Sequence, residues 1–268
     1  MFNFSRVWTI LDKEWAEVFK NHVVLFTVIL MPLIFTLLPL GLLFFFGSNP
    51  AMQGGDSADV PAEFAAACGN GNLSTMDCVQ VFLINEFMLL YMIMPIAIPI
   101  AIAAYSIVGE KATHSLEPLL ATPITTEELL VGKGISAVIP AVAATWGCFL
   151  LFLFVSPLTG ISKGVQAYIA GPTWLLAIFV ISPLMAIMAV NFAIFVSSRT
   201  ADPRVAEQVS AVLILPVIVV LFGQLAGFLI LNVQLMLFTI AGLIAIDIAM
   251  VMLGARLFRR ETILTGWK

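Results

Sequence analysis

The sequence predicts an all-α integral membrane domain, residues 1–268, with six transmembrane helices and both termini in the cytoplasm. Three observations predict it: the composition, a series of long uncharged segments, and the distribution of Lys and Arg. The chain is 61% hydrophobic and 10% charged, whereas a soluble domain is roughly half apolar and a quarter charged. Apolar runs of about 20 residues cross a bilayer as helices, because each helix satisfies its own backbone hydrogen bonds.

Four segments free of Asp, Glu, Lys and Arg are long enough to cross about 30 Å of hydrocarbon. They cover residues 23–46, 87–107, 134–158 and 172–198. A fifth uncharged stretch, 209–246, would form a straight helix of about 57 Å, nearly twice the thickness of the hydrocarbon core. It must fold back, and Asn232 and Gln234 place the break near residues 227–234. A fifth span therefore precedes this break, and a sixth covers about 235–258.

Lys and Arg differ sharply between alternate loops. One side holds eleven of the twelve basic residues, and the other holds only Lys163. Short loops rich in Lys and Arg stay in the cytoplasm, so both termini are predicted inside. An odd number of spans would place the cluster of Arg256, Arg259 and Arg260 outside, which also supports the break between spans five and six. The predicted location is a cell membrane, and we favour a prokaryotic plasma membrane.

An amphipathic helix is predicted before the first span, within residues 1–21. Its apolar residues share one helical face, and most of its charged residues lie elsewhere. Two interpretations stay open: an interfacial elbow that lies on the inner leaflet and contacts a cytoplasmic partner, or a plain membrane anchor. The apolar face consists of Phe4, Val7, Trp8, Leu11, Trp15 and Val18.

The predicted outer loop, residues 48–82, contains no Lys or Arg and two of the three cysteines, Cys68 and Cys78. Because this loop faces the oxidising side, we expect a disulfide between them, with free thiols as the alternative. Cys148 lies within the third span and is expected to be a small packing residue.

The longest charged segment on the inner side, residues 109–133, reads GEKATHSLEPLLATPITTEELLVGK. Pro118 and Pro123 interrupt it. Thr125 and Glu128 have the spacing of a capping box, which predicts a short helix that starts just after the Thr and runs towards the third span. The segment is therefore predicted to form helix, break, helix.

The first part of this segment has an apolar edge formed by Leu116, Leu119 and Leu120. An apolar edge on a helix can dock into a groove of a soluble subunit. The alternative is an ordinary loop that lies on the lipid headgroups. The charged residues beside the edge are Glu110, Lys111 and Glu117.

The motifs of this segment resemble the type-2 permease family of ABC transporters. Members commonly carry an acidic-basic opening, a Thr-Leu-Glu-like step, a Leu-Leu-Ala-Thr-Pro-like turn, a polar helix start and a Gly-Lys. The six-span layout and the C-terminal stretch LFRRE, residues 257–261, extend the resemblance over nearly the whole chain. The matching motifs here are Glu110-Lys111, Ser115-Leu116-Glu117, Leu119 to Pro123, Thr125 to Glu128, and Gly132-Lys133.

The sequence departs from the family pattern in two places. Ala112 and His114 stand where an acidic residue and Gly are frequent. The short break near Asn232 leaves little room for the re-entrant helical pair that several relatives place before the last span.

The resemblance implies an inner-loop coupling helix that docks on a separate ATPase subunit. That subunit would hold ATP and Mg²⁺, and no cofactor is implied in this chain. It also implies a second permease subunit, in a homodimer or heterodimer. The residues assigned to coupling are Glu110, Lys111, Ser115, Leu116, Glu117, Leu119, Leu120, Pro123, Thr125, Glu127, Glu128 and Lys133.

The chain by itself is not predicted to be an enzyme. No stretch matches the phosphate-binding pattern G-x-x-x-x-G-K-[ST], so hydrolysis is expected in the partner. The two histidines, His22 and His114, do not form the H-E-x-x-H pattern of zinc proteases, and no metal site is expected. The sequence has no basic patch that would indicate nucleic-acid binding. Membrane lipid is expected to surround the predicted spans.

Three polar residues are candidate contacts in a transport pathway. Asp247 is the one carboxylate deep in a predicted span, where an ionised carboxylate is costly unless it is paired or faces water. It is interpreted either as a substrate or ion contact in the pathway, or as a packing residue that is protonated or hydrogen-bonded to a partner such as Asn191. Glu86 lies at the predicted outer mouth of the second span, where a solvated carboxylate is expected.

Gly223 and Gly227 form a G-x-x-x-G pair in the fifth span, a pattern that allows close helix approach. In the family, spans one and five commonly line the contact between two permease subunits. The pair is therefore a candidate for that contact, with packing inside one chain as the alternative.

The function expected from the resemblance is the membrane-spanning permease of an ATP-driven exporter for a hydrophobic or amphipathic small molecule or lipid. One alternative is a secondary carrier driven by an ion gradient, which would favour two inverted halves and more polar groups at the midplane. Others are ABC-type export of an ion such as sodium, and a sensor or assembly factor that binds through the outer loop.

Overall fold

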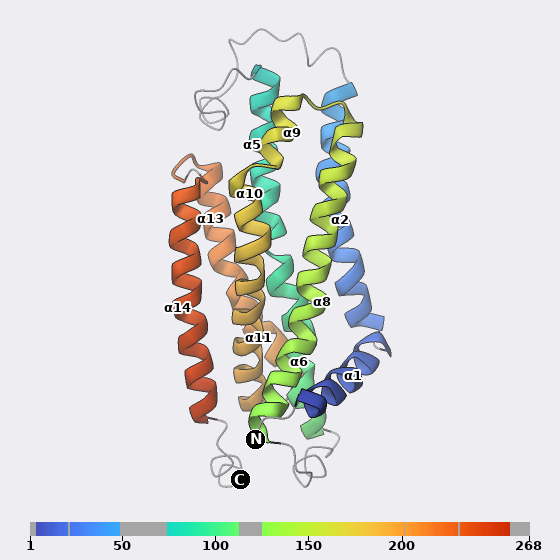
Figure 1. Cartoon of the computed structure of the whole chain (residues 1–268), viewed down its shortest axis with the longest axis vertical. Coiled ribbons are helices and arrows are strands. Elements are labelled where there is room, and N and C mark those ends of the chain that lie inside the picture. Colours follow the sequence, from blue (N-terminus) through green and yellow to red (C-terminus); the bar gives the residue numbers. More distant parts are fainter. Residues whose placement is uncertain are drawn as a thin grey trace.

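The computed structural model is a bundle of long helices (Figure 1). It describes residues 4–20, 22–48, 74–112, 125–200, 202–229 and 231–257. In these residues there are no strands, and six helical stretches are long and apolar enough to cross a membrane. The predicted all-α class and the predicted six spans are therefore confirmed.

Helix α1 (Phe4–Lys20) precedes the first span, which is α2 (His22–Ser48). The second span consists of α5 (Thr75–Tyr91) and α6 (Met94–Ala112), which a short turn joins. The third is α8 (Thr126–Val155). The remaining elements, in chain order, are η2 (Ser156–Thr159), α9 (Lys163–Ile169), α10 (Pro172–Leu176), the π-helical turn η3 (Ala177–Ile181), α11 (Ser182–Arg199), α12 (Pro203–Ser210), η4 (Ala211–Ile214), α13 (Leu215–Leu225) and α14 (Val233–Leu257).

The second span begins earlier than predicted. Its apolar helical stretch covers Met76–Ala104, whereas the uncharged run starts only at residue 87. Helix α5 starts at a capping box, in which the Ser74 hydroxyl accepts from the Asp77 N–H and the Asp77 carboxylate accepts from the Ser74 N–H, both at 3.2 Å. The helix then continues through Glu86, because an isolated charged residue interrupts an uncharged run without ending a helix.

The predicted fold-back between spans five and six is confirmed. Helix α13 ends at Leu225, and α14 starts at Val233. Gly227 lies in this connection with a left-handed φ of 74°, a conformation that suits Gly because it has no Cβ. The connection of residues 226–232 is too short for a re-entrant helical pair.

The second span forms the centre of the bundle. In its apolar window 78% of the residues are buried, against 17% in spans five and six and 28% in span one. Helix α6 packs against α11 and α8, and α14 packs against α11. The other spans therefore present much of their apolar surface outward.

In Figure 1, helix α1, the start of α8 and the end of α14 all lie at the lower end of the bundle, and α9 and the start of α5 lie at the upper end. We name these the inner and outer ends, following the distribution of Lys and Arg.

We expect cysteines introduced at Ser57 and Asn70 to react with an impermeant thiol reagent added outside intact cells. Cysteines at Thr126 and Thr265 are expected to react only after the cytoplasmic side is opened. Labelling each variant in a background without the native cysteines measures this, and reversed labelling at any of the four sites would overturn the orientation.

Candidate functional site

The inner end of α8 is fixed by the predicted capping box. The Thr125 hydroxyl accepts from the Glu128 N–H at 3.2 Å, and the Glu128 carboxylate accepts from the Thr125 N–H at 2.9 Å. The predicted helix start is confirmed, but no separate short helix follows it, because α8 continues without a break to Val155. The first turn of the third span therefore directly follows residues 113–124.

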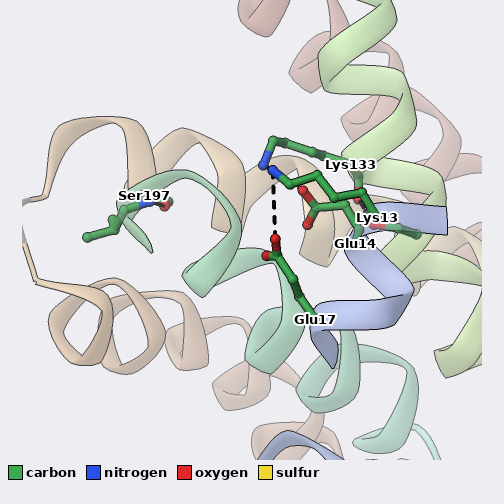
Figure 2. Close-up of polar contacts among 7 residues, drawn as sticks. Lys13, Glu14, Glu17, Lys133 and Ser197 are labelled. Atoms are coloured by element: carbon green, nitrogen blue, oxygen red, sulfur yellow. Dashed lines mark hydrogen bonds and ion pairs between the residues drawn. The ribbon is translucent and has the colours of Figure 1, made fainter. Parts of the chain in front are cut away.

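Two ion pairs join this start of α8 to helix α1. Arg6 Nη1 lies 3.5 Å from Glu128 Oε2, and Lys133 Nζ lies 2.9 Å from Glu14 Oε1. The Lys133 and Glu14 side chains are only 1% and 6% exposed, so this second pair is shielded from water. Figure 2 shows Lys133 beside Glu14, with the exposed Lys13 and Glu17 next to them on α1.

Close packing accompanies the two ion pairs. Val7, Ile10 and Leu11 of α1 are buried, and a Cβ placed on Gly132 would lie only 2.9 Å from Ile10 Cγ2. Gly132 therefore lets α1 approach the backbone of α8. Beside it, the Trp15 indole N–H donates to the Ser136 carbonyl at 3.1 Å. In the Gly132-Lys133 pair, the glycine thus allows the close approach of α1 to α8, and the lysine provides the buried cation.

Substituting Gly132 with Val is expected to force α1 and α8 apart and to lower the free energy of unfolding by roughly 1 to 3 kcal/mol, as overpacking usually does. Gly147→Val is the matched control, because Gly147 lies on the same helix and a Cβ there meets no atom within 4 Å. Thermal unfolding of the purified chain measures both changes. Equal unfolding midpoints for the two variants would contradict this close contact.

Apart from Thr125, the residues assigned to coupling fall into three groups. Glu110 and Lys111 lie in the last turn of α6, and Glu127 lies in the first turn of α8. Glu128 and Lys133 are buried against α1 instead of facing outward. The residues outside the described part of the chain are Ser115, Leu116, Glu117, Leu119, Leu120 and Pro123.

A buried serine ties α6 to α11 at the inner end. The Ser197 hydroxyl donates to the Ala104 carbonyl at 3.0 Å and accepts from the Val108 N–H at 3.2 Å. These two backbone groups are four residues apart on α6, the spacing of one backbone hydrogen bond of the helix. The hydroxyl therefore contacts both groups of that spacing. Ser197 is fully buried. It therefore fastens α11 to α6 a few residues before Glu110.

Sequence reasoning missed Glu14 and Ser197. Glu14 follows Val7 by seven residues and so lies on the apolar stripe of α1, where an acidic residue needs a partner. That misplaced acid was a usable signal for a buried ion pair. Ser197 gave no signal, because serine is common within apolar helices and usually bonds to its own helix.

The three pathway candidates do not form one site. Asp247 is 7% exposed, and neither of its carboxylate oxygens has a hydrogen-bond partner among the described residues. The hydrogen bond to Asn191, which one of the two interpretations included, is therefore not formed. Glu86 corrects another expectation. It lies eleven residues into α5, about 16 Å along the helix, and its carboxylate oxygens are buried there without a hydrogen bond to any described residue. It is not a solvated residue at the mouth of the span.

The predicted G-x-x-x-G packing face is not formed, because Gly227 lies beyond the end of α13. The Gly223 carbonyl accepts from the N–H groups of Phe228 and Leu229 at 2.9 and 3.2 Å. A Cβ on Gly223 would meet Leu229 Cδ1 at 2.8 Å. Both glycines therefore serve the turn that ends the fifth span.

Cys78 is in a disulfide, whereas Cys148 is free. The expected partner, Cys68, lies outside the described residues, so the pairing of these two cysteines stays a prediction. Within the described residues, no group of three or more His, Cys, Asp or Glu is placed to hold a metal ion.

Comparison with known families agrees with this architecture. A family model described as "ABC-2 family transporter protein" matches residues 8–259, from α1 to just past the end of α14. The comparison with curated proteins gave no match. The resemblance drawn from residues 109–133 is thereby confirmed at the level of the family. Six apolar helices and a match of this extent lead to one conclusion: the chain is a multi-pass membrane protein that belongs to the ABC-2 transporter family.

Proposed function

We propose that the chain is the membrane-spanning permease subunit of an ATP-driven exporter, coupled at its inner end to a separate nucleotide-binding subunit. The family match over residues 8–259 is the observation that carries this proposal. The ATPase subunit would supply ATP and Mg²⁺. A second permease subunit is the further partner that the family resemblance implies.

The contacts at the inner end support a route for coupling through residues 113–124. This segment connects α6 to α8, and each of these helices is tied to another element. Helix α8 is held to α1 by the Lys133–Glu14 pair and the close approach at Gly132, and α6 is held to α11 by Ser197. A force applied to the segment would then move two helix pairs, in the manner of rigid elements that shift against each other.

The proposed cargo is a hydrophobic or amphipathic small molecule or lipid. Most spans expose apolar side chains outward, and a molecule dissolved in the bilayer can reach such surfaces without crossing water. A secondary carrier is the competing function. Glu86 and Asp247 favour it, because their carboxylates are buried without a partner among the described residues and ion-driven carriers use intramembrane acids.

Inside-out membrane vesicles distinguish these two functions. We expect vesicles that contain the chain and its ATPase to accumulate a lipophilic fluorescent dye when Mg-ATP is added, and to continue when ionophores dissipate the proton and sodium gradients. A non-hydrolysable ATP analogue is the control. Uptake that needs an ion gradient and no ATP would replace the proposal with a secondary carrier.

A further inference from the structure

An apolar groove of about 570 Å³ lies between α8, α11 and α14. Its lining comes from the inner half of each helix, including Gly134 of α8, Ile187 of α11 and Gly254 of α14. Asn191 is the only polar side chain among the described residues that line it. The volume falls in the range of about 300 to 1,000 Å³ that is usual for small-molecule sites.

Asp247 lies one helical turn from this groove, on the same face of α14. The buried residues Leu243 and Asp247 are four residues apart on α14, and the half-buried Met250 and Gly254 continue the same face at the next two turns. Met250 and Gly254 line the groove. Asp247 itself is not among the residues that line the groove, but it lies on the face of α14 that packs against α11.

Among the described residues, the carboxylate of Asp247 has no hydrogen-bond partner that would stabilise its charge. Its residue is 7% exposed, and both oxygens are buried without a hydrogen bond to any described residue. An intramembrane acid of this kind is costly when ionised and marks a functional site by default. A positive group brought by a ligand would supply the missing partner.

We propose that this groove binds an amphipathic molecule with an apolar body and one cationic group. The apolar body lies between α8 and α14, and the cationic group pairs with Asp247, with the Asn191 amide oxygen as a further polar contact. Among the described residues, no Lys or Arg lines the groove, so the nearby Asp247 carboxylate makes the site complementary to a cation. The inference deepens the proposed function and rests on it, since it defines the cargo of the exporter as a lipophilic cation that enters from the inner leaflet.

The test uses radiolabelled tetraphenylphosphonium, an apolar molecule with a permanent positive charge. Its binding is measured at equilibrium on the full chain in discs of zwitterionic lipid, without an ATPase subunit. Tetraphenylborate, a negative molecule of nearly the same shape, is the matched probe. We expect saturable binding of the cation and much weaker binding of the anion.

Two variants examine the two parts of the site. Asp247→Asn keeps the shape and removes the charge, and it should weaken cation binding by about tenfold or more, as the loss of one partner of a buried charge pair does. Gly254→Phe should block the groove and abolish binding. Gly242→Phe is its control, because Gly242 lies on the same helix outside the groove, and a Cβ at either glycine meets no atom within 4 Å.

Several outcomes would overturn this inference: equal binding of the two probes, unchanged cation binding in Asp247→Asn, or the same affinity in Gly254→Phe as in Gly242→Phe. If Asp247→Asn fails to fold, the two glycine variants still decide whether the groove is the site. Absence of saturable binding would reject the groove and leave the proposed function standing. Failure of ATP to drive transport would reject the proposed function without altering a positive binding result.

Discussion

Lys133→Met is expected to destabilise the protein by about 3 to 5 kcal/mol, because it leaves the Glu14 carboxylate buried without its partner. The two side chains are 2.9 Å apart and nearly inaccessible to water. The Glu14 carboxylate would lose the attraction of Lys133 in a place where water does not replace it. Thermal unfolding of the purified chain in detergent should show a clear fall in the unfolding midpoint.

Two controls separate loss of the pair from loss of a charged side chain. Lys13→Met removes a cation from the neighbouring pair with Glu17, whose side chains are 42% and 61% exposed and 3.8 Å apart; exposed pairs contribute at most about 1 kcal/mol. The double variant Glu14→Leu, Lys133→Met removes both charges and should recover most of the stability. A double variant as unstable as Lys133→Met would contradict this account of the ion pair.

The double variant Leu119→Asp, Leu120→Asp should still insert and fold, yet it should lose copurification of the ATPase and substrate-stimulated hydrolysis. Each Leu buried in a partner's groove contributes roughly 1.5 to 3 kcal/mol, whereas charges at the rim mainly set orientation. Glu127→Gln is the control and should do much less. Both leucines lie in the inner segment outside the described residues, so the prediction rests on the sequence motif.

To measure this effect, membrane insertion of each variant is checked first. The amount of ATPase that copurifies with each variant is then compared with the amount that copurifies with wild type. Retention at the wild-type level by a properly inserted double variant would reject the inner segment as the coupling element.

Strong local signals made the spans predictable. Runs of twenty or more apolar residues can satisfy their backbone only as helices in lipid, and a stretch too long for one span must turn. The capping box at Thr125 and Glu128 was also predictable from sequence, because it depends only on residues three positions apart. The start of the second span was misplaced because Glu86 interrupts the apolar run while the helix continues through it.

The contacts at the inner end could not be predicted from sequence, because they join residues far apart in the chain. The family resemblance assigned Lys133 to coupling with the partner subunit. Packing of α1 against α8 buries it instead, beside a carboxylate from the first turns of the protein. The groove beside Asp247 depends likewise on three helices that meet only in the folded bundle.

Isolation of the native complex tests the central claim most directly. The tagged chain is purified from its own membrane in mild detergent, its subunits are identified by mass spectrometry, and hydrolysis of Mg-ATP is measured. The account predicts a second polypeptide in stoichiometric amount that carries the G-x-x-x-x-G-K-[ST] pattern, with hydrolysis that disappears when this subunit is removed. A chain that is isolated without such a subunit, and that transports its cargo in ATP-free vesicles, would contradict it.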